Sequence, residues 1–133
     1  MDKHALEKKR EATIKEYYAK QRQAEVRLDE LKTKRRAIES HLDDTYHFKV
    51  KTYEMLDRHR SELKRHGARR EFEMIQSVIV VLHQDCRDVG SEFFDVLDEI
   101  EREQKKIHKE NEDIEIEYRR TISALREGKT HES

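Results

Sequence analysis

The feature that most constrains the fold of this chain is its low content of proline and glycine, the residues that break or end helices. The 133 residues include no proline and only three glycines. Proline removes a backbone donor and clashes with the preceding turn, and glycine weakens a helix through backbone entropy. A chain with so few of them can continue one helix for many turns. We therefore expect a small number of long helices.

The balance of charged and apolar residues excludes a multilayer core. Charged residues make up 44% of the chain and hydrophobic residues 34%, with a mean hydropathy of -1.16. The net charge of -1 removes the self-repulsion that is typical of disordered chains. The composition thus favours an all-α protein whose long helices pair along a narrow apolar stripe.

Apolar residues recur at alternating steps of three and four, which is the spacing of one helix face. A stripe with polar interruptions runs from Ile14 to Leu63, and a fully apolar one runs from Phe72 to Ile100. Beyond Ile100 a stutter interrupts the second stripe, which then resumes over 107–125. One helix is therefore predicted in each half of the chain.

The segment "RHGARR" separates the two stripes and contains Gly67. Glycine adopts positive φ freely, and the cations before it suit the negative end of a helix, so the chain is expected to turn here. Gly90 is a competing break, but the stripe continues in phase through it. The prediction is a single helical-hairpin domain over 1–127, with helices at about 5–65 and 70–126 and a turn at 66–69. Gly128 is expected to cap the second helix, and 128–133 to form a disordered tail.

The charge distribution predicts an antiparallel arrangement. If residue i faces about residue 134 − i, the segment 17–36, with a net charge of +4, lies opposite the segment 98–117, with a net charge of −5. Such flanking charges determine the orientation and register of the two helices, but each exposed ion pair adds little to the stability of the fold. We therefore expect a long antiparallel helical hairpin, which could dimerise into a four-helix bundle.

Several large apolar residues lie off the stripes and predict a binding surface. Two interpretations are open, because such residues either contact a partner or widen the core between the two helices. We favour the partner. The predicted contact residues combine members of the second stripe with residues beside either stripe: Met74, Ile75, Val78, Ile79, Leu82, Phe93, Phe94, Leu97, Tyr46, Tyr53 and Met55.

Other classes of site are not favoured by the sequence. The eight histidines lack the spacing of a metal site, and no nucleophile elbow or phosphate-binding loop occurs, so no catalytic residue, metal or cofactor is expected. The residues around the predicted turn are basic, but they lack aromatics for base stacking, so nucleic acid is not an expected partner. No direct membrane insertion is expected, because the longest apolar stretch, Val78–Leu82, is short. The lone Cys86 excludes an internal disulfide, and a cytoplasmic protein is predicted, with export together with a partner left open.

The C-terminal half resembles the small helical companions of LXG toxins, which are antibacterial toxins exported by the type VII (ESX-like) secretion system of Gram-positive bacteria. The resemblance is carried by "FFDVLD", by the long Glu/Lys-rich helix that follows it and by a late "YRR" before the final leucine. It covers about residues 70–128. The Trp-x-Gly turn of classical ESX substrates is absent, and "RHGARR" stands in its place.

The resemblance implies a targeting factor or chaperone. Such a protein would bind the N-terminal LXG domain of its cognate toxin, with room for a second small helical companion and for contact with the secretion ATPase. It implies an export signal of an aromatic residue and an aspartate one helical turn apart, which corresponds to Phe94 and Asp98, or alternatively to Tyr53 and Asp57. The rival hypothesis is a structural coiled-coil scaffold or spacer that forms homo-oligomers.

Overall fold

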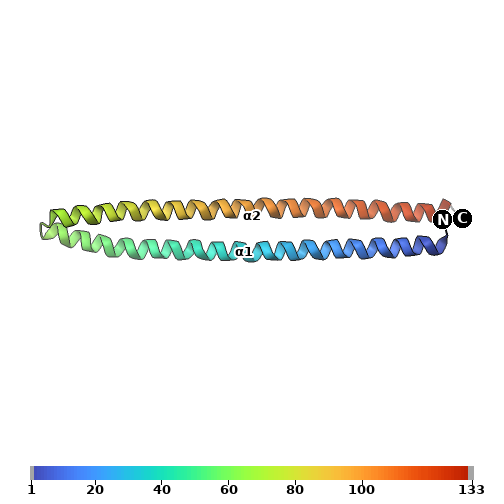
Figure 1. Cartoon of the computed structure of the whole chain (residues 1–133), viewed down its shortest axis with the longest axis horizontal. Coiled ribbons are helices and arrows are strands. Elements are labelled where there is room, and N and C mark those ends of the chain that lie inside the picture. The colour runs from blue at the N-terminus through green and yellow to red at the C-terminus, as the bar shows by residue number, and fades with distance from the viewer. Residues whose placement is uncertain (1, 132–133) are drawn as a thin grey trace. The chain divides into compact units, whose positions relative to one another are not determined.

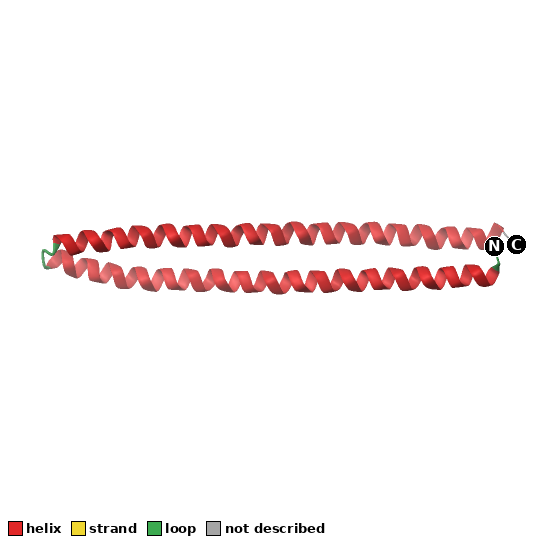
Figure 2. Ribbon diagram, in the orientation of Figure 1, coloured by secondary structure: helices red, strands yellow, loops and turns green. Residues whose placement is uncertain are grey.

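The structure, a computed structural model, describes residues 2–131, which form two α-helices (Figures 1 and 2). Helix α1 spans Lys3–Arg65 and helix α2 spans Arg69–His131. The helices pack against each other as an antiparallel hairpin, and no strand occurs among the described residues. The predicted all-α hairpin is confirmed.

The reversal of the chain occurs at Gly67, as predicted. Gly67 has φ of 72°, its N–H donates to the Lys64 carbonyl at 3.2 Å, and the Ala68 N–H donates to the Leu63 carbonyl at 3.0 Å. This pair of bonds is a Schellman motif, which satisfies carbonyls that the end of a helix leaves unpaired. Glycine is required here because a Cβ at positive φ is strained.

The end of α2 differs from the prediction. The helix continues through Gly128 to His131, so the expected cap at Gly128 is not formed and 128–131 are helical. Residues 132–133 of the expected tail lie outside the described residues. Glycine inside a helix costs only about 1 kcal/mol, and no proline follows to stop the chain, so the helix continues.

The hairpin consists of two units, to each of which both helices contribute. We call Met1–Thr33 together with Ile100–Ser133 the terminal unit, and Lys34–Glu99 the turn unit. In the terminal unit the rings of Tyr17 and Tyr118 stack with centroids 4.0 Å apart. Its core contains four buried side chains: Leu6, Ala24, Ile100 and Ile107, the last only 1% exposed.

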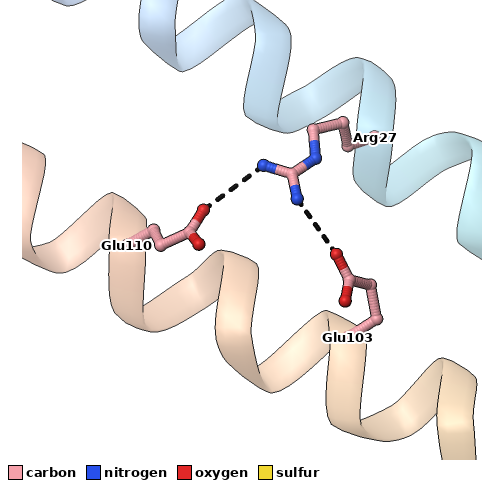
Figure 3. Close-up of polar contacts among 3 residues, drawn as sticks. All are labelled: Arg27, Glu103 and Glu110. Carbon is pink, nitrogen blue, oxygen red and sulfur yellow. Dashed lines mark hydrogen bonds and ion pairs between the residues drawn. The ribbon is translucent and has the colours of Figure 1, made fainter.

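An ion-pair cluster joins the helices of the terminal unit (Figure 3). Arg27 on α1 donates from Nη2 to Glu103 Oε1 at 3.0 Å and from Nη1 to Glu110 Oε2 at 3.3 Å, both on α2. Arg27 belongs to the basic segment and both glutamates to the acidic one, as the charge distribution predicted. Other charges pair within one helix instead, as Lys20 does with Glu16.

The turn unit has a thinner core than the terminal unit. Ile79, 5% exposed, is its buried hydrophobic residue, and the other members of its stripes are mostly half-buried. Cross-helix contacts are made by Tyr53 with His83, whose ring centroids are 5.4 Å apart, and by His41 with Phe93 at 5.9 Å. These pairs follow the predicted pairing of residue i with about residue 134 − i to within about two positions.

Candidate protein-binding surface

Exposed apolar side chains are concentrated in the turn unit. The two units are similar in length, yet the terminal unit exposes only three large apolar residues among those described: Tyr18, Val26 and Ile116. The turn unit exposes nine: Tyr46, Phe48, Met55, Met74, Val78, Val80, Val81, Val89 and Phe94. Exposed apolar residues that gather in one part of a molecule often mark sites of protein contact.

One side of the turn unit, which we call the first flank, is identified by two cross-helix contacts. Tyr53 lies against His83, and Arg60 Nη1 donates to Gln76 Oε1 at 3.1 Å. Residues three or seven apart lie on the same side of a helix. Tyr46 and Leu97 are one and two heptads from Tyr53 and His83, and Val80 and Phe94 each lie three residues before a residue of this side, His83 and Leu97. The apolar residues of the first flank are Tyr46, Tyr53, Val80, Phe94 and Leu97.

Phe94 is the largest exposed apolar side chain of the first flank on α2. It is 61% exposed, and Tyr46 on α1 is 63% exposed. Gly90 lies one helical turn before Phe94, and a Cβ at Gly90 would have no heavy atom within 4 Å. A glycine in the middle of a helix costs backbone entropy, and no neighbouring atom of this chain requires glycine rather than a larger residue at this position. An approaching helix backbone would make use of that space.

The opposite side of the turn unit, which we call the second flank, contains Phe48 and Met55 on α1, one heptad apart. On α2 it contains Val78, with Met74 and Val81 one turn before and after it. All five are exposed: Phe48, Met55, Met74, Val78 and Val81. A shallow groove on α1, lined by Met55, Leu56, Arg58, His59 and Glu62, borders the same flank.

The predicted contact residues fall into two groups. Tyr46, Met55, Met74, Val78 and Phe94 are exposed, and Leu97 and Tyr53 are half-buried on the first flank. The remaining residues lie on the stripe of α2 that packs against α1: Ile75, Ile79, Leu82 and Phe93. Ile79 is a core residue that the closed hairpin leaves only 5% exposed, so its prediction as a partner contact is corrected.

The structure distinguishes the two candidate export signals by their accessibility. Arg60 Nη2 donates a hydrogen bond to Asp57 Oδ1, and this bond is the main cause that raises the pKa of the Arg60 guanidinium. Tyr53 contacts His83, and both Tyr53 and Asp57 are half-buried. Phe94 and Asp98 are both exposed and lie one turn apart on one face. A receptor would reach the second pair more easily.

Three exposed residues of the two flanks are absent from the predicted contact set: Phe48, Val80 and Val81. Phe48 lies off the apolar stripe of α1, and this position in the sequence was sufficient to identify it as a candidate contact. Val80 and Val81 follow Ile79 directly, so the run "VIVVL" places apolar residues around most of the helix circumference. A helix that is apolar all round is usually covered on more than one side.

The described part of the chain lacks the features of a metal site and of a membrane-spanning segment. Within residues 2–131, no group of three or more His, Cys, Asp or Glu side chains is arranged to hold a metal ion. Neither helix contains, in that range, a stretch long and apolar enough to cross a bilayer. The half-buried Cys86 is a free thiol on the α2 stripe.

Comparison of this chain with known protein families, with curated proteins and with solved structures gave no match.

Proposed function

We propose that this chain is a non-catalytic binding protein whose first flank packs against a helix of a partner protein. The observation that carries the proposal is that Phe94 and Tyr46, 61% and 63% exposed, lie on the flank that contains the open space at Gly90. Burying one large apolar side chain completely contributes about 1.5–3 kcal/mol. Several such residues on one flank supply the driving force for adding a third helix to the hairpin.

The partner that we propose is the LXG domain of a secreted toxin, which this chain would direct to the type VII secretion apparatus. The resemblance of residues 70–128 to LXG companions supports this partner. The helical hairpin also suits the role, because a helical domain with an apolar stripe can pack along the first flank. Phe94 and Asp98 would then form the export signal: Phe94 contacts the LXG helix, and Asp98, exposed one turn later on α2, is presented to the secretion apparatus.

Co-expression with an N-terminal LXG fragment tests the binding step. We expect the two chains to co-purify, and Phe94→Asp to abolish the complex because it places a charge among apolar contacts. Ile116→Asp is the matched control, since Ile116 is 49% exposed and lies in the terminal unit; it should leave binding unchanged. Separate elution of toxin and wild-type chain would refute the proposed partner.

Toxin export tests the signal separately from binding. Asp98→Ala is expected to block secretion of the toxin while the complex stays intact, whereas Asp57→Ala should leave secretion unchanged because Tyr53 and Asp57 are half-buried and Phe94 and Asp98 are exposed. Secretion is measured from culture supernatants, and complex formation by pull-down. Normal export with Asp98→Ala would exclude Phe94 and Asp98 as the signal.

A further inference from the structure

The second flank lies on the other side of the hairpin from the proposed partner site, and its charges differ between the two helices. On α2 its apolar residues are continued by six carboxylates and no basic residue: Glu71, Asp85, Asp88, Glu92, Asp95 and Glu99. On α1 the corresponding positions carry Lys51, Arg58 and Arg65 against Asp44 and Glu62. The flank thus has an acidic edge on α2 and a mixed, slightly basic edge on α1.

We propose that the second flank binds a second copy of this chain. Two turn units would meet face to face about a two-fold axis parallel to the helices, so that α1 of one copy packs on α2 of the other. This choice of axis follows from charge, because the alternative axis would place the acidic edge of α2 against itself. The result is a four-helix bundle in which Met55 of one copy covers Val78 and Val81 of the other.

The register of this dimer follows from the contacts within the hairpin. Tyr53 with His83 and Arg60 with Gln76 define which residues of α1 and α2 lie at the same level. A two-fold axis parallel to the helices keeps those levels, so Lys51 of one copy approaches Asp85 of the other.

The same register determines where the dimer contact ends on either side of the apolar residues. Towards the turn, Arg65 of one copy lies at the level of Glu71 of the other. Beyond Phe48, away from the turn, both edges become acidic, with Asp44 at the level of Glu92. The contact is therefore expected to end between Phe48 and Asp44.

The dimer and the proposed toxin complex use different flanks and do not compete. A second copy covers Met55 and Val81, while Phe94 and Tyr46 stay accessible on the other side. Self-association therefore goes beyond the binding of a partner protein, and each copy in the dimer could still bind one partner helix. The failure of either proposal leaves the other standing.

Sedimentation equilibrium of the full-length chain tests the dimer. We expect the wild type to be dimeric and Val81→Glu to weaken association by about a hundredfold, because a two-fold interface contains the substitution twice, at about tenfold or more each. Val81 is 56% exposed, so the monomer should tolerate the change, which circular dichroism verifies. Met55→Glu is the second test from the other helix, and Phe94→Asp is the control that should remain dimeric.

A charge exchange tests the proposed axis. Lys51→Glu should weaken the dimer, and the double variant Lys51→Glu with Asp85→Lys should restore it, because the two positions meet across the interface. A wild type that is monomeric overturns the proposal. A dimer that survives Val81→Glu and Met55→Glu but is lost with Phe94→Asp also overturns it, since it would place self-association on the first flank. Failure of the double variant to restore the dimer would exclude this axis.

Discussion

The two interior glycines of the chain provide a paired test in which the same chemical change has opposite effects. Gly90 lies in the middle of α2, and an added Cβ would meet no heavy atom within 4 Å. Gly67 has the same free space but a φ of 72°. Space therefore does not distinguish the two sites, and backbone conformation does.

The expected magnitudes follow from that difference. Alanine in place of glycine inside a helix contributes about 0.8–1.0 kcal/mol, so Gly90→Ala should stabilise the hairpin by about 1 kcal/mol. A side chain at positive φ costs about 1–2 kcal/mol, so Gly67→Ala should destabilise it by a similar amount. For a chain of this size, 1 kcal/mol corresponds to a change in Tm of about 4 °C.

Urea denaturation followed by circular dichroism measures both variants. The free energy of unfolding should rise for Gly90→Ala and fall for Gly67→Ala, with unchanged m-values. Gly90→Ala should also weaken binding of the partner helix if that helix approaches closely at this point. A decrease in stability with Gly90→Ala would refute the inference that its surroundings are open and helical.

Three further predictions concern the terminal unit. Ile107→Ala should destabilise the chain by about 2–5 kcal/mol in urea denaturation because its side chain is buried, whereas Ile116→Ala should change stability by less than about 0.5 kcal/mol; equal effects would refute the described core. Asn111 Oδ1 is buried without a hydrogen-bond partner, so Asn111→Leu should stabilise the chain by about 1 kcal/mol, and a loss of stability would contradict this. Arg27→Ala should cost less than about 1 kcal/mol, because its ion pairs are about half exposed, and the cost should shrink as salt is added; a salt-independent loss would argue against the bridge to Glu103 and Glu110.

The hairpin itself was predictable because its determinants are local. Stripe spacing depends on residues three and four apart, and the turn depends on one glycine after a run of cations. Because the chain contains no proline, no such residue breaks either helix at another position. Even the orientation was readable, since the basic residue Arg27 and the acidic residues Glu103 and Glu110 belong to separate segments whose charges are opposite.

The candidate surface was predictable only in part. Phe94 and Tyr46 were recognised as lying off the stripes, and both are exposed. Ile79 was assigned to the same surface, although it packs in the core. The expected cap at Gly128 was also wrong, since glycine ends a helix only where the following residues support the cap, and α2 continues past it.

Sequence alone therefore determined which segments are helical, where they reverse and in which direction they pair, because each of these depends on near neighbours along the chain. The tertiary structure decided which side chains remain available. Tyr53 and Phe94 look alike as off-stripe aromatics, but His83 lies against the first and no cross-helix ring contact involves the second among the described residues. That difference depends on which residue of α1 lies at the level of which residue of α2, and a distance between helices is not encoded in the periodicity of either one.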